Sequence, residues 1–189
     1  VCVQPSPAMP LYFWGDDDGS RLRDSYFDVF PGVWRHGDWI RIAPSGGSVI
    51  YGRSDATINR RGLRLGSSEI YRAVEGLDEV VDSLVVDLEF LGRDSFMPLF
   101  VVMREGHALD EAMRERIKGA IREAVSARFL PDDIVEIAEV PRTLSGKKLE
   151  VPVKKLLLGA DPAKAVNRDS MANPEAFDAF LDYAAKRAG

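Results

Sequence analysis

The spacing of apolar residues along the chain changes near residue 55. Before that point, prolines and a run of acidic residues interrupt any regular period, and only two short stretches, 39–43 and 48–53, read as strands. Between them stands the sequence Pro-Ser-Gly-Gly at 44–47, which is typical of a turn joining two antiparallel strands. The first part of the chain therefore predicts one β-hairpin and little other regular structure.

From residue 55 onward, strand-like and helix-like patterns alternate. Three apolar runs predict strands, over 80–90, 97–105 and 133–140. A helix is expected from Ser67 or Ser68 to about Leu77, because serine is a favourable residue at the start of a helix.

The longest predicted helix follows Asp110, whose carboxylate can cap its first turn. Apolar residues recur in it every four positions and form one stripe that packs on a sheet; they are Leu109, Met113, Ile117, Ile121 and Val125. A shorter helix is expected over 151–159, where Pro152 is tolerated in the first turn. A last helix is expected up to Arg187, with Asn173 as its cap.

These elements predict an α+β fold for residues 55–160, with a small mixed sheet and flanking helices, at a normal size for a domain. Residues 161–189 read as a C-terminal extension with a polar spacer and the last helix. Residues 1–54 are too short to form a domain alone, so we expect them to be the strand and hairpin remnant of a larger upstream domain. The start of the chain, inside a strand-like run and without a methionine, suggests a fragment. Asp55 would then lie at a junction between domains, where hinges occur.

Composition narrows the classes of protein. The chain has 189 residues, of which 46% are hydrophobic and 29% charged, as expected of a folded protein. A net charge of -5 argues against nucleic-acid binding, and no apolar run has membrane-spanning length. Cys2 is the single cysteine and cannot form an internal disulfide, and no Cys/His cluster has metal-ligand spacing. We therefore expect a reduced compartment, by default the cytoplasm, and no metal bound by the fold.

The first of three motifs suited to chemistry is WRHGDW at 34–39. In it Asp38 follows a glycine and precedes a strand. A carboxylate at this place can accept two hydrogen bonds from a vicinal diol such as a ribose. The alternative is that Asp38 caps its own turn, and the motif by itself favours this alternative.

The second motif lies within 52–75. Arg53 offers a planar fork of donors suited to phosphate or ribose oxygens. Further along, Gly62 stands among three arginines at 60, 61 and 64, so a ligand could approach the backbone closely while the arginines neutralise its phosphates. The alternative is an exposed basic hairpin with a turn glycine, and the residues alone leave both readings open.

The third motif is PRTLSGKKLE at 141–150. Ser145 and Gly146 predict a tight turn from which Lys147 projects, a compact cation on a flexible stem that could reach a charged reaction centre. A solvated lysine on a turn is the alternative, and the Ser-Gly-Lys tripeptide alone favours it. The remaining glycines of a Walker A loop are missing, which excludes that mode of nucleotide binding.

Taken together and in this order, the motifs resemble the C-terminal motifs of the adenylate-forming enzymes, the superfamily of acyl-CoA synthetases, peptide-synthetase adenylation domains and luciferases. They are GD at 37–38, GRSD at 52–55, RGLR at 61–64 and PRTLSGK at 141–147. The resemblance covers nearly the whole chain, and within the superfamily the stretches WRHGDWIRI and TLSGKKLEVPVKKLL are most similar to the acetoacetyl-CoA synthetase family. It implies that the α+β part is the small mobile C-terminal lid domain of such an enzyme.

The resemblance implies a role for individual residues of the nucleotide site. Asp38 matches the acid that holds the ribose hydroxyls of ATP and of the acyl-adenylate, and Arg53 matches the arginine that supports the same nucleotide. Lys147 matches the catalytic lysine that contacts the carboxylate and the α-phosphate during adenylation. Asp55 matches the hinge about which the small domain rotates between the two half-reactions.

Three further residues are matched around the phosphates and CoA. Gly62 matches the glycine beside the pantetheine channel, where any side chain would obstruct the thiol. Arg64 matches a basic residue near the nucleotide phosphates. Arg122 falls where an acetyl-CoA synthetase relative contacts the CoA phosphate. Rotation about the hinge would withdraw Lys147 and present the Gly62 face to CoA.

The implied activity is ligation of a short acid, acetoacetate, to CoA with ATP and Mg²⁺, giving AMP and pyrophosphate. The phosphate loop and the acyl pocket of the family have no counterpart in this chain, so we expect the chain alone to be inactive. Two alternatives are a ligase for another short acid and a non-catalytic binding module, and the joint presence of the matched residues argues against the module. Lys147 would also be a natural target for a lysine acetyltransferase and a deacetylase, because acetylation removes the charge of its ammonium group.

Overall fold

The computed structural model describes residues 1–4, 6–54, 57–60, 63–90 and 93–188. The chain divides into two compact units, a first unit, Val1–Ser54, and a second unit, Asp55–Gly189. Asp55 and Gly62, two residues that the resemblance singles out, lie outside the described residues. The predicted limits 1–54, 55–160 and 161–189 stay a prediction about the whole protein.

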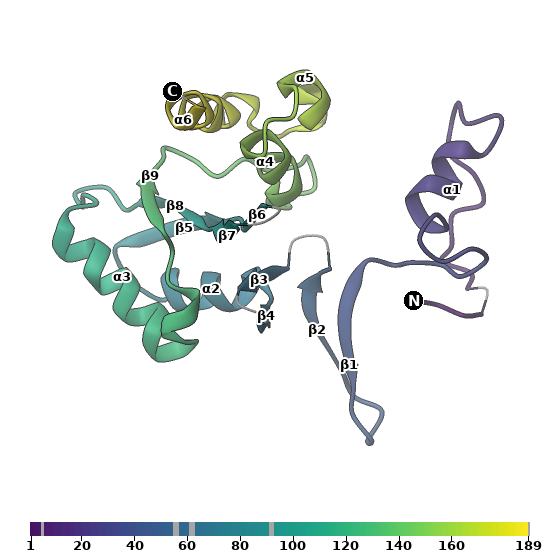
Figure 1. The fold of residues 1–189 in the computed structure, drawn as a ribbon, viewed down its shortest axis with the longest axis horizontal. Coiled ribbons are helices and arrows are strands. Elements are labelled where there is room, and N and C mark those ends of the chain that lie inside the picture. The colour runs from purple at the N-terminus through teal and green to yellow at the C-terminus, as the bar shows by residue number, and fades with distance from the viewer. Residues whose placement is uncertain (5, 55–56, 61–62, 91–92, 189) are drawn as a thin grey trace. The chain divides into compact units, whose positions relative to one another are not determined.

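The first unit contains a β-hairpin formed by β1 (Asp38–Ile42) and β2 (Ser48–Arg53) (Figure 1). The strands pair antiparallel, from Asp38 opposite Arg53 to Ile42 opposite Ser48. In the turn between them, Gly46 has a φ of 86°, a left-handed conformation that favours glycine. The hairpin predicted from the sequence is therefore present.

Helix α1 (Ser20–Tyr26) also belongs to the first unit. Just before it, the buried Asp16 carboxylate accepts hydrogen bonds from the backbone N–H groups of Arg21 at 3.0 Å and Leu22 at 2.9 Å. These amides have no acceptor within the first turn of a helix, so the carboxylate satisfies them. Sequence analysis predicted no regular structure here.

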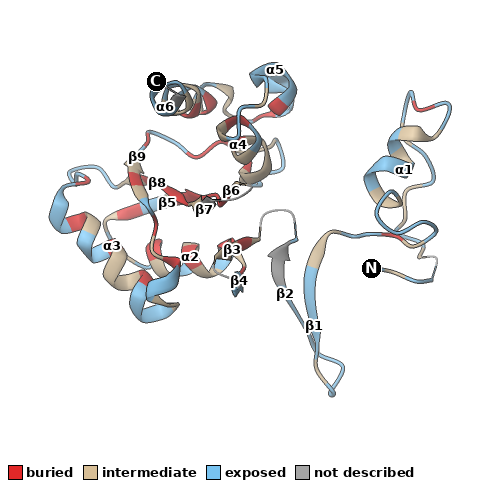
Figure 2. Cartoon of the chain, in the orientation of Figure 1, coloured by how far each residue is buried: buried red, intermediate tan, exposed pale blue. Residues whose placement is uncertain are grey.

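Few apolar side chains of the first unit are buried. Trp34 is 7% exposed, whereas Trp14 is 91% and Ile42 is 70% exposed. Figure 2 shows that the described part of the β-hairpin is largely exposed. Because hydrophobic stabilisation grows with the apolar area removed from water, the first unit has little of it from its own residues.

The second unit is built on a three-stranded sheet in the order β5-β8-β9. Strand β5 (Val80–Val85) pairs antiparallel with β8 (Pro98–Met103), and β8 pairs parallel with β9 (Asp133–Glu136). Each strand lies inside a run that the apolar pattern predicted as a strand. The mixed sheet expected from the sequence is confirmed.

Two short antiparallel pairs accompany this sheet. Strand β3 (Ile58–Arg60) pairs with β4 (Leu63–Leu65), and β6 (Leu88–Phe90) pairs with β7 (Arg93–Phe96). The single strand predicted over 80–90 is thus wrong in its extent, because the chain leaves the central sheet after β5 and begins a new pair at β6.

The helices described in the second unit are α2 (Ser67–Val74), α3 (Glu111–Ala124), α4 (Glu150–Leu157), α5 (Pro162–Ala165) and α6 (Asp178–Ala188), with 3₁₀ turns at Ala127–Phe129, Arg168–Ser170 and Pro174–Phe177. The predicted cap of α3 is confirmed, since the Asp110 carboxylate accepts the Met113 N–H at 2.8 Å. The predicted serine cap of α2 is wrong, because Gly66 precedes that helix and Ser67 is already its first residue.

Two hydrophobic cores lie on opposite faces of the central sheet. Along β8, Leu99 and Val101 join the core that includes residues of α2 and α3, while Phe100 joins the core that includes residues of α4 and α6. Figure 1 shows the two pairs of helices on opposite sides of the strands. The rings of Phe100 and Phe180 lie 4.6 Å apart, so the C-terminal helix forms part of the second core. The α+β class with flanking helices is confirmed.

Candidate functional site

The segment Arg142 to Lys148 forms a hairpin that carries Lys147, and we name it the lysine hairpin. Arg142 and Lys148 face each other as an antiparallel bridge. The Thr143 N–H donates to the Lys147 carbonyl at 2.9 Å, and the Gly146 N–H donates to the Thr143 carbonyl at 2.8 Å. Gly146 has a φ of 81°, so glycine lets this turn close without strain. The structure therefore has the tight turn that the Ser-Gly pair predicts.

Lys147 lies at the exposed tip of the lysine hairpin. Its backbone N–H donates to Thr143 Oγ1 at 3.1 Å, and the same oxygen lies 3.0 Å from Ser145 Oγ. Within the described part of the chain, no hydrogen bond or ion pair occupies its ammonium group. Because its backbone is fixed, Lys147 can bind an anionic ligand without first breaking an ion pair to any of the described residues.

Lys148, the next residue, is enclosed instead. Its Nζ donates to Glu75 Oε1 at 2.6 Å and to the Ser83 carbonyl at 2.7 Å, and it lies 2.8 Å from Asp82 Oδ1. The same nitrogen lies 3.9 Å from the centroid of the Tyr71 ring. Three acceptors match the three N–H groups of an ammonium, so Lys148 ties the hairpin to α2 and β5.

Arg142 anchors the other leg of the lysine hairpin. One arm of its guanidinium donates to Asp82 Oδ2 at 2.6 Å, and the other donates to the Gly146 carbonyl at 2.7 Å. Its backbone N–H donates to Asn173 Oδ1 at 2.8 Å, while Asn173 Nδ2 donates to the Val140 carbonyl at 2.9 Å. The side-chain cap predicted for Asn173 is wrong, because that side chain fixes the lysine hairpin instead.

Glu150, just after the lysine hairpin, links it to α2. One of its carboxylate oxygens accepts the hydroxyl of Ser67 at 2.7 Å and the hydroxyl of Tyr71 at 2.5 Å. The Tyr71 oxygen in turn accepts the Val85 N–H at 3.3 Å. Burial, followed by the nearby Glu150 charge, raises the pKa of Tyr71 well above its usual value, so the phenol keeps its proton and remains a donor. Both ends of α2 are thus fastened to the segment 148–150.

The predicted CoA-facing glycine, Gly62, stands in the sequence between β3 and β4. Residues 61–62 lie outside the described residues, and Arg64 on β4 is exposed. The Arg60 guanidinium donates to the Leu130 carbonyl at 2.6 Å and pairs with Asp132 at 3.0 Å. Arg60 therefore fastens β3 to the segment before β9, while the grouping of the three arginines around Gly62 stays a prediction.

Arg122 is exposed on the last turn of α3, the helix that buries Met113, Ile117 and Ile121. A cation near the C-terminus of a helix also interacts favourably with the helix dipole. Its position therefore has a structural explanation as well as the predicted one, and contact with CoA stays a prediction.

Asp38 opens β1 in the first unit, with 19% of its side chain exposed. Its Oδ2 contacts Nδ1 of His36, whose ring packs against the Trp34 ring at 5.1 Å between centroids. Arg53 lies opposite Asp38 in the backbone register, but its side chain is outside the described residues. His36 was not among the predicted residues. It stands two positions before Asp38, with Gly37 between them at a φ of 87°, and this spacing is the sequence signal for it.

The predicted residues thus fall into two groups. Asp38 and Arg53 are brought together by the hairpin of the first unit. Arg64, Arg122 and Lys147 lie on three different elements of the second unit: β4, α3 and the lysine hairpin. Each group is held by its own unit, so neither unit carries all the predicted chemistry.

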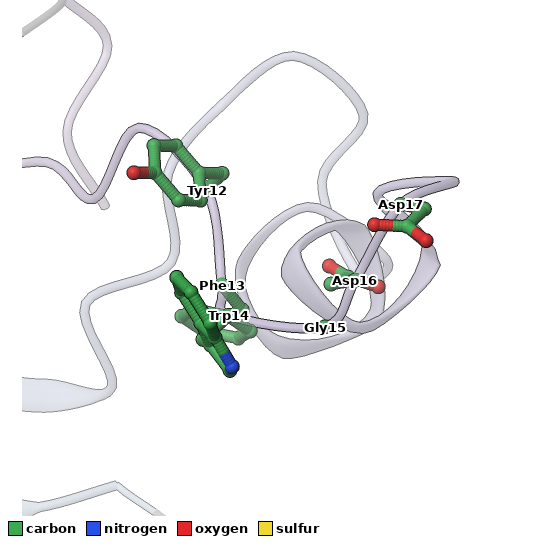
Figure 3. Close-up of a pocket in the computed structure, with 6 residues that line it drawn as sticks. All are labelled: Tyr12, Phe13, Trp14, Gly15, Asp16 and Asp17. Atoms are coloured by element: carbon green, nitrogen blue, oxygen red, sulfur yellow. The ribbon is translucent and has the colours of Figure 1, made fainter.

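A cavity of about 530 Å³ opens in the first unit, lined by Tyr12, Phe13, Trp14, Gly15, Asp16 and Asp17. Figure 3 shows the aromatic rings of this stretch apart from the two carboxylates. Tyr12 is 71% exposed, and Asp16 is engaged at the start of α1. This cavity contains none of the residues predicted for binding or catalysis.

Among the described residues, none of the helices combines the length and the apolar character of a membrane span. In the same residues, no three side chains of His, Cys, Asp or Glu come together as ligands for a metal ion.

No protein-family model matches the chain. The acetoacetyl-CoA synthetase of Macaca fascicularis is 46% identical over 184 residues, which cover 96% of this chain and 27% of the relative. The acetoacetyl-coenzyme A synthetase of Rhizobium meliloti is 44% identical over 180 residues, covering 95% of this chain and 27% of the relative. The solved acetoacetyl-CoA synthetase from Streptomyces lividans matches with a TM-score of 0.88 and 48% identity over 98% of this chain and 28% of that one. The chain therefore spans about a quarter of the length of these relatives.

Proposed function

Because the chain matches the C-terminal portion of acetoacetyl-CoA synthetases over nearly its whole length, we propose that the complete protein is an AMP-forming ligase that joins acetoacetate to CoA. The observation that carries the proposal is the match to the Streptomyces lividans protein, at 48% identity and a TM-score of 0.88. Since this chain covers 28% of that structure, we expect the chain alone to be inactive.

The proposed reaction has two halves. In the first, a carboxylate oxygen of acetoacetate attacks the α-phosphorus of ATP, the acyl-adenylate forms and pyrophosphate leaves. In the second, the CoA thiol loses its proton, its sulfur attacks the acyl carbon, and AMP leaves. Negative charge is redistributed around the α-phosphate in the first half, so a cation placed there stabilises the transition state.

Lys147 is the proposed cation for adenylation. Its support is the environment described above, an ammonium group that has no ion-pair partner among the described residues, at the tip of a hairpin whose base is fixed by Arg142 and Lys148. A fixed backbone reduces the conformational freedom that must be lost when the lysine meets the carboxylate and the α-phosphate.

Asp38 is proposed to accept the ribose hydroxyls of the nucleotide, with Arg53 beside it. A carboxylate has two oxygens and accepts hydrogen bonds from both hydroxyls of a vicinal diol. The contact of His36 Nδ1 with Asp38 Oδ2 helps to fix the orientation of the carboxylate. His36 would therefore be a positioning residue rather than a ligand of the nucleotide.

The CoA side of the proposal rests on three residues. Gly62 would border the pantetheine channel, and Arg64 and Arg122 would face phosphates of the nucleotide and of CoA. The exposure of both arginines is consistent with this role. Asp55 is proposed as the hinge that exchanges Lys147 for the Gly62 face between the two halves.

ATP and CoA are the proposed cofactors, bound mainly through the part of the protein upstream of this chain. Magnesium is proposed only as the partner of ATP. The described residues do not come together as a set of carboxylate ligands for it, so no step is assigned to this chain through the metal.

A cytoplasmic location and acetylation of Lys147 also remain proposals. Acetylation is supported by the exposed ammonium group at the tip of the lysine hairpin. Neutralising it would remove the charge on which its proposed role depends. A modifying acetyltransferase and a deacetylase would then regulate adenylation.

The decisive experiment assays the full-length protein with acetoacetate, other short acids, ATP and CoA. Formation of acetoacetyl-CoA and AMP, with acetoacetate giving the highest kcat/KM, is the expected result. A higher kcat/KM with another acid would show that the proposed substrate is wrong while the proposed ligase activity is right. No turnover with any acid would favour a binding module.

A further inference from the structure

Both legs of the lysine hairpin end on one carboxylate, that of Asp82. Lys148 Nζ lies 2.8 Å from Asp82 Oδ1, and Arg142 donates to Asp82 Oδ2 at 2.6 Å. We propose that Asp82 is a positioning residue for adenylation, which holds the two legs of the lysine hairpin so that Lys147 points at the reacting carboxylate and phosphate. The inference rests on the proposed function of Lys147.

The route from Asp82 to Lys147 runs through Arg142. The guanidinium that pairs with Asp82 also donates to the Gly146 carbonyl at 2.7 Å, and Gly146 directly precedes Lys147. A guanidinium is planar and rigid, so the position of its arm on Asp82 fixes the direction of its arm on Gly146. A change at Asp82 therefore reaches the peptide group that carries Lys147.

The Lys148 side gives the second fixed point. Its ammonium shares its three hydrogen bonds among Glu75, the Ser83 carbonyl and Asp82, and its side chain is 15% exposed. All three N–H groups of the Lys148 ammonium donate hydrogen bonds inside the protein, so an outward rotation of this side chain would break them. The lysine hairpin is thus fixed at both legs and exposed only at its tip.

Asp82 stays ionised while it makes these contacts. Burial by itself favours the neutral acid, but the hydrogen bonds and charges of Lys148 and Arg142 outweigh burial and lower the pKa of Asp82. Both oxygens therefore remain acceptors for cations at neutral pH.

A purely structural role for Asp82 predicts different results. Loss of stability in the second unit would lower both half-reactions together, since the proposed CoA-facing residues lie on the same unit. A positioning role predicts that adenylation falls while thioester formation from supplied acetoacetyl-adenylate continues. It also predicts that the effect disappears once Lys147 is removed.

The test uses the full-length protein with Asp82→Asn, which keeps the shape and removes the charge. Asp78→Asn is the matched control, since that aspartate is exposed and lies outside the lysine hairpin contacts. A misplacement of about 1 Å can reduce a rate about 100-fold, so we expect kcat for adenylation to fall about 10- to 100-fold in Asp82→Asn. Thioester formation in that variant, and both half-reactions in the control, should stay within about 2-fold.

The double variant Asp82→Asn with Lys147→Ala separates positioning from general damage. If Asp82 acts through Lys147, adding Asp82→Asn to Lys147→Ala causes no further loss of the residual adenylation. A further loss by the same factor as in the wild-type background would overturn the inference, and so would equal losses in both halves. Should Asp82→Asn fail to fold, Arg142→Lys tests the same route, because it keeps a positive charge and loses the fork that joins Asp82 to Gly146.

Failure of the inference and failure of the proposed function give different results. If Lys147→Ala itself leaves adenylation intact, the role proposed for Lys147 is wrong. If Lys147→Ala abolishes adenylation while Asp82→Asn and Arg142→Lys do not change it, only the positioning role is wrong.

Discussion

The tip and the base of the lysine hairpin present the same side chain in two opposite environments. Lys147 at the tip is exposed and unpaired within the described part of the chain, whereas Lys148 at the base has two carboxylates, a carbonyl and an aromatic face around its ammonium group. One residue along the chain thus separates a cation that can bind a ligand from a cation that fixes the fold. The number of internal acceptors around a lysine therefore decides whether it is available to a ligand or stabilises the fold.

The largest effect is expected at the tip, from Lys147→Met in the full-length protein. The variant keeps a side chain of similar length and loses the charge, so adenylation should fall about 100- to 1000-fold, the scale of removing one electrostatic stabiliser of a transition state. Pyrophosphate exchange measures this half-reaction, and thioester formation from supplied adenylate serves as the control. A loss of similar size in pyrophosphate exchange and in thioester formation would contradict the role proposed for the tip of the lysine hairpin.

The matched change at the base, Lys148→Met, should act on stability. It leaves the Glu75 carboxylate without this cation and Asp82 paired with Arg142 alone, so the free energy of unfolding of the chain should fall by about 3 kcal/mol. Urea denaturation of the 189-residue chain measures it, with Lys147→Met changing stability by less than about 0.5 kcal/mol as the control. Equal stability of the two variants would contradict the comparison.

A smaller effect is expected at the base from Tyr71→Phe. The change removes the hydroxyl that donates to Glu150 at 2.5 Å and leaves the Val85 N–H without that acceptor. We expect a loss of about 1 to 2 kcal/mol in the free energy of unfolding. Tyr12→Phe is the matched control, since Tyr12 is 71% exposed. A similar loss in the control would show that the hydrogen bond between Tyr71 and Glu150 does not account for the loss of stability.

The smallest effect concerns pH. The lowered pKa of Asp82 means that its contribution to stability is present above the pKa that it has in the unfolded chain and is lost as the pH falls through its lower folded value. The difference in stability between the wild type and Asp82→Asn should therefore be constant above about pH 5 and shrink below about pH 4, near the ordinary pKa of an aspartate. Denaturation curves from pH 7 to pH 3 test this, and a difference independent of pH would show that the charge of Asp82 is not involved.

Local patterns predicted the parts of the fold that depend on neighbours in sequence. The four-residue spacing of Met113, Ile117 and Ile121 gave α3, and Asp110 gave its cap. The hairpin of the first unit followed from its turn residues in the same way. The tight turn at Gly146 was predicted because it depends on the backbone conformation of the glycine itself.

The missed features depend on residues far apart in sequence. Two hydrogen-bond partners of Lys148, Glu75 just after α2 and Ser83 on β5, lie 73 and 65 residues away along the chain, so the Ser-Gly-Lys-Lys pattern contains no sign of them. Asn173 reads as a helix cap, yet its side chain binds the backbone of Arg142, 31 residues before it. The family resemblance predicted which residues belong to the candidate site. The ion pairs that distinguish a ligand-binding lysine from a structural lysine were known only from the folded structure.

The hydrogen bonds of Glu150 determine the smallest segment that could be transferred between related proteins without breaking them. A graft of residues 142–150 alone would separate Glu150 from the Ser67 and Tyr71 hydroxyls. The hairpin, α2, β5 and Glu150 therefore form the smallest unit that can be transferred intact. Recombination breakpoints between residues 67 and 150 should be poorly tolerated, because they separate Glu150 from its partner Ser67.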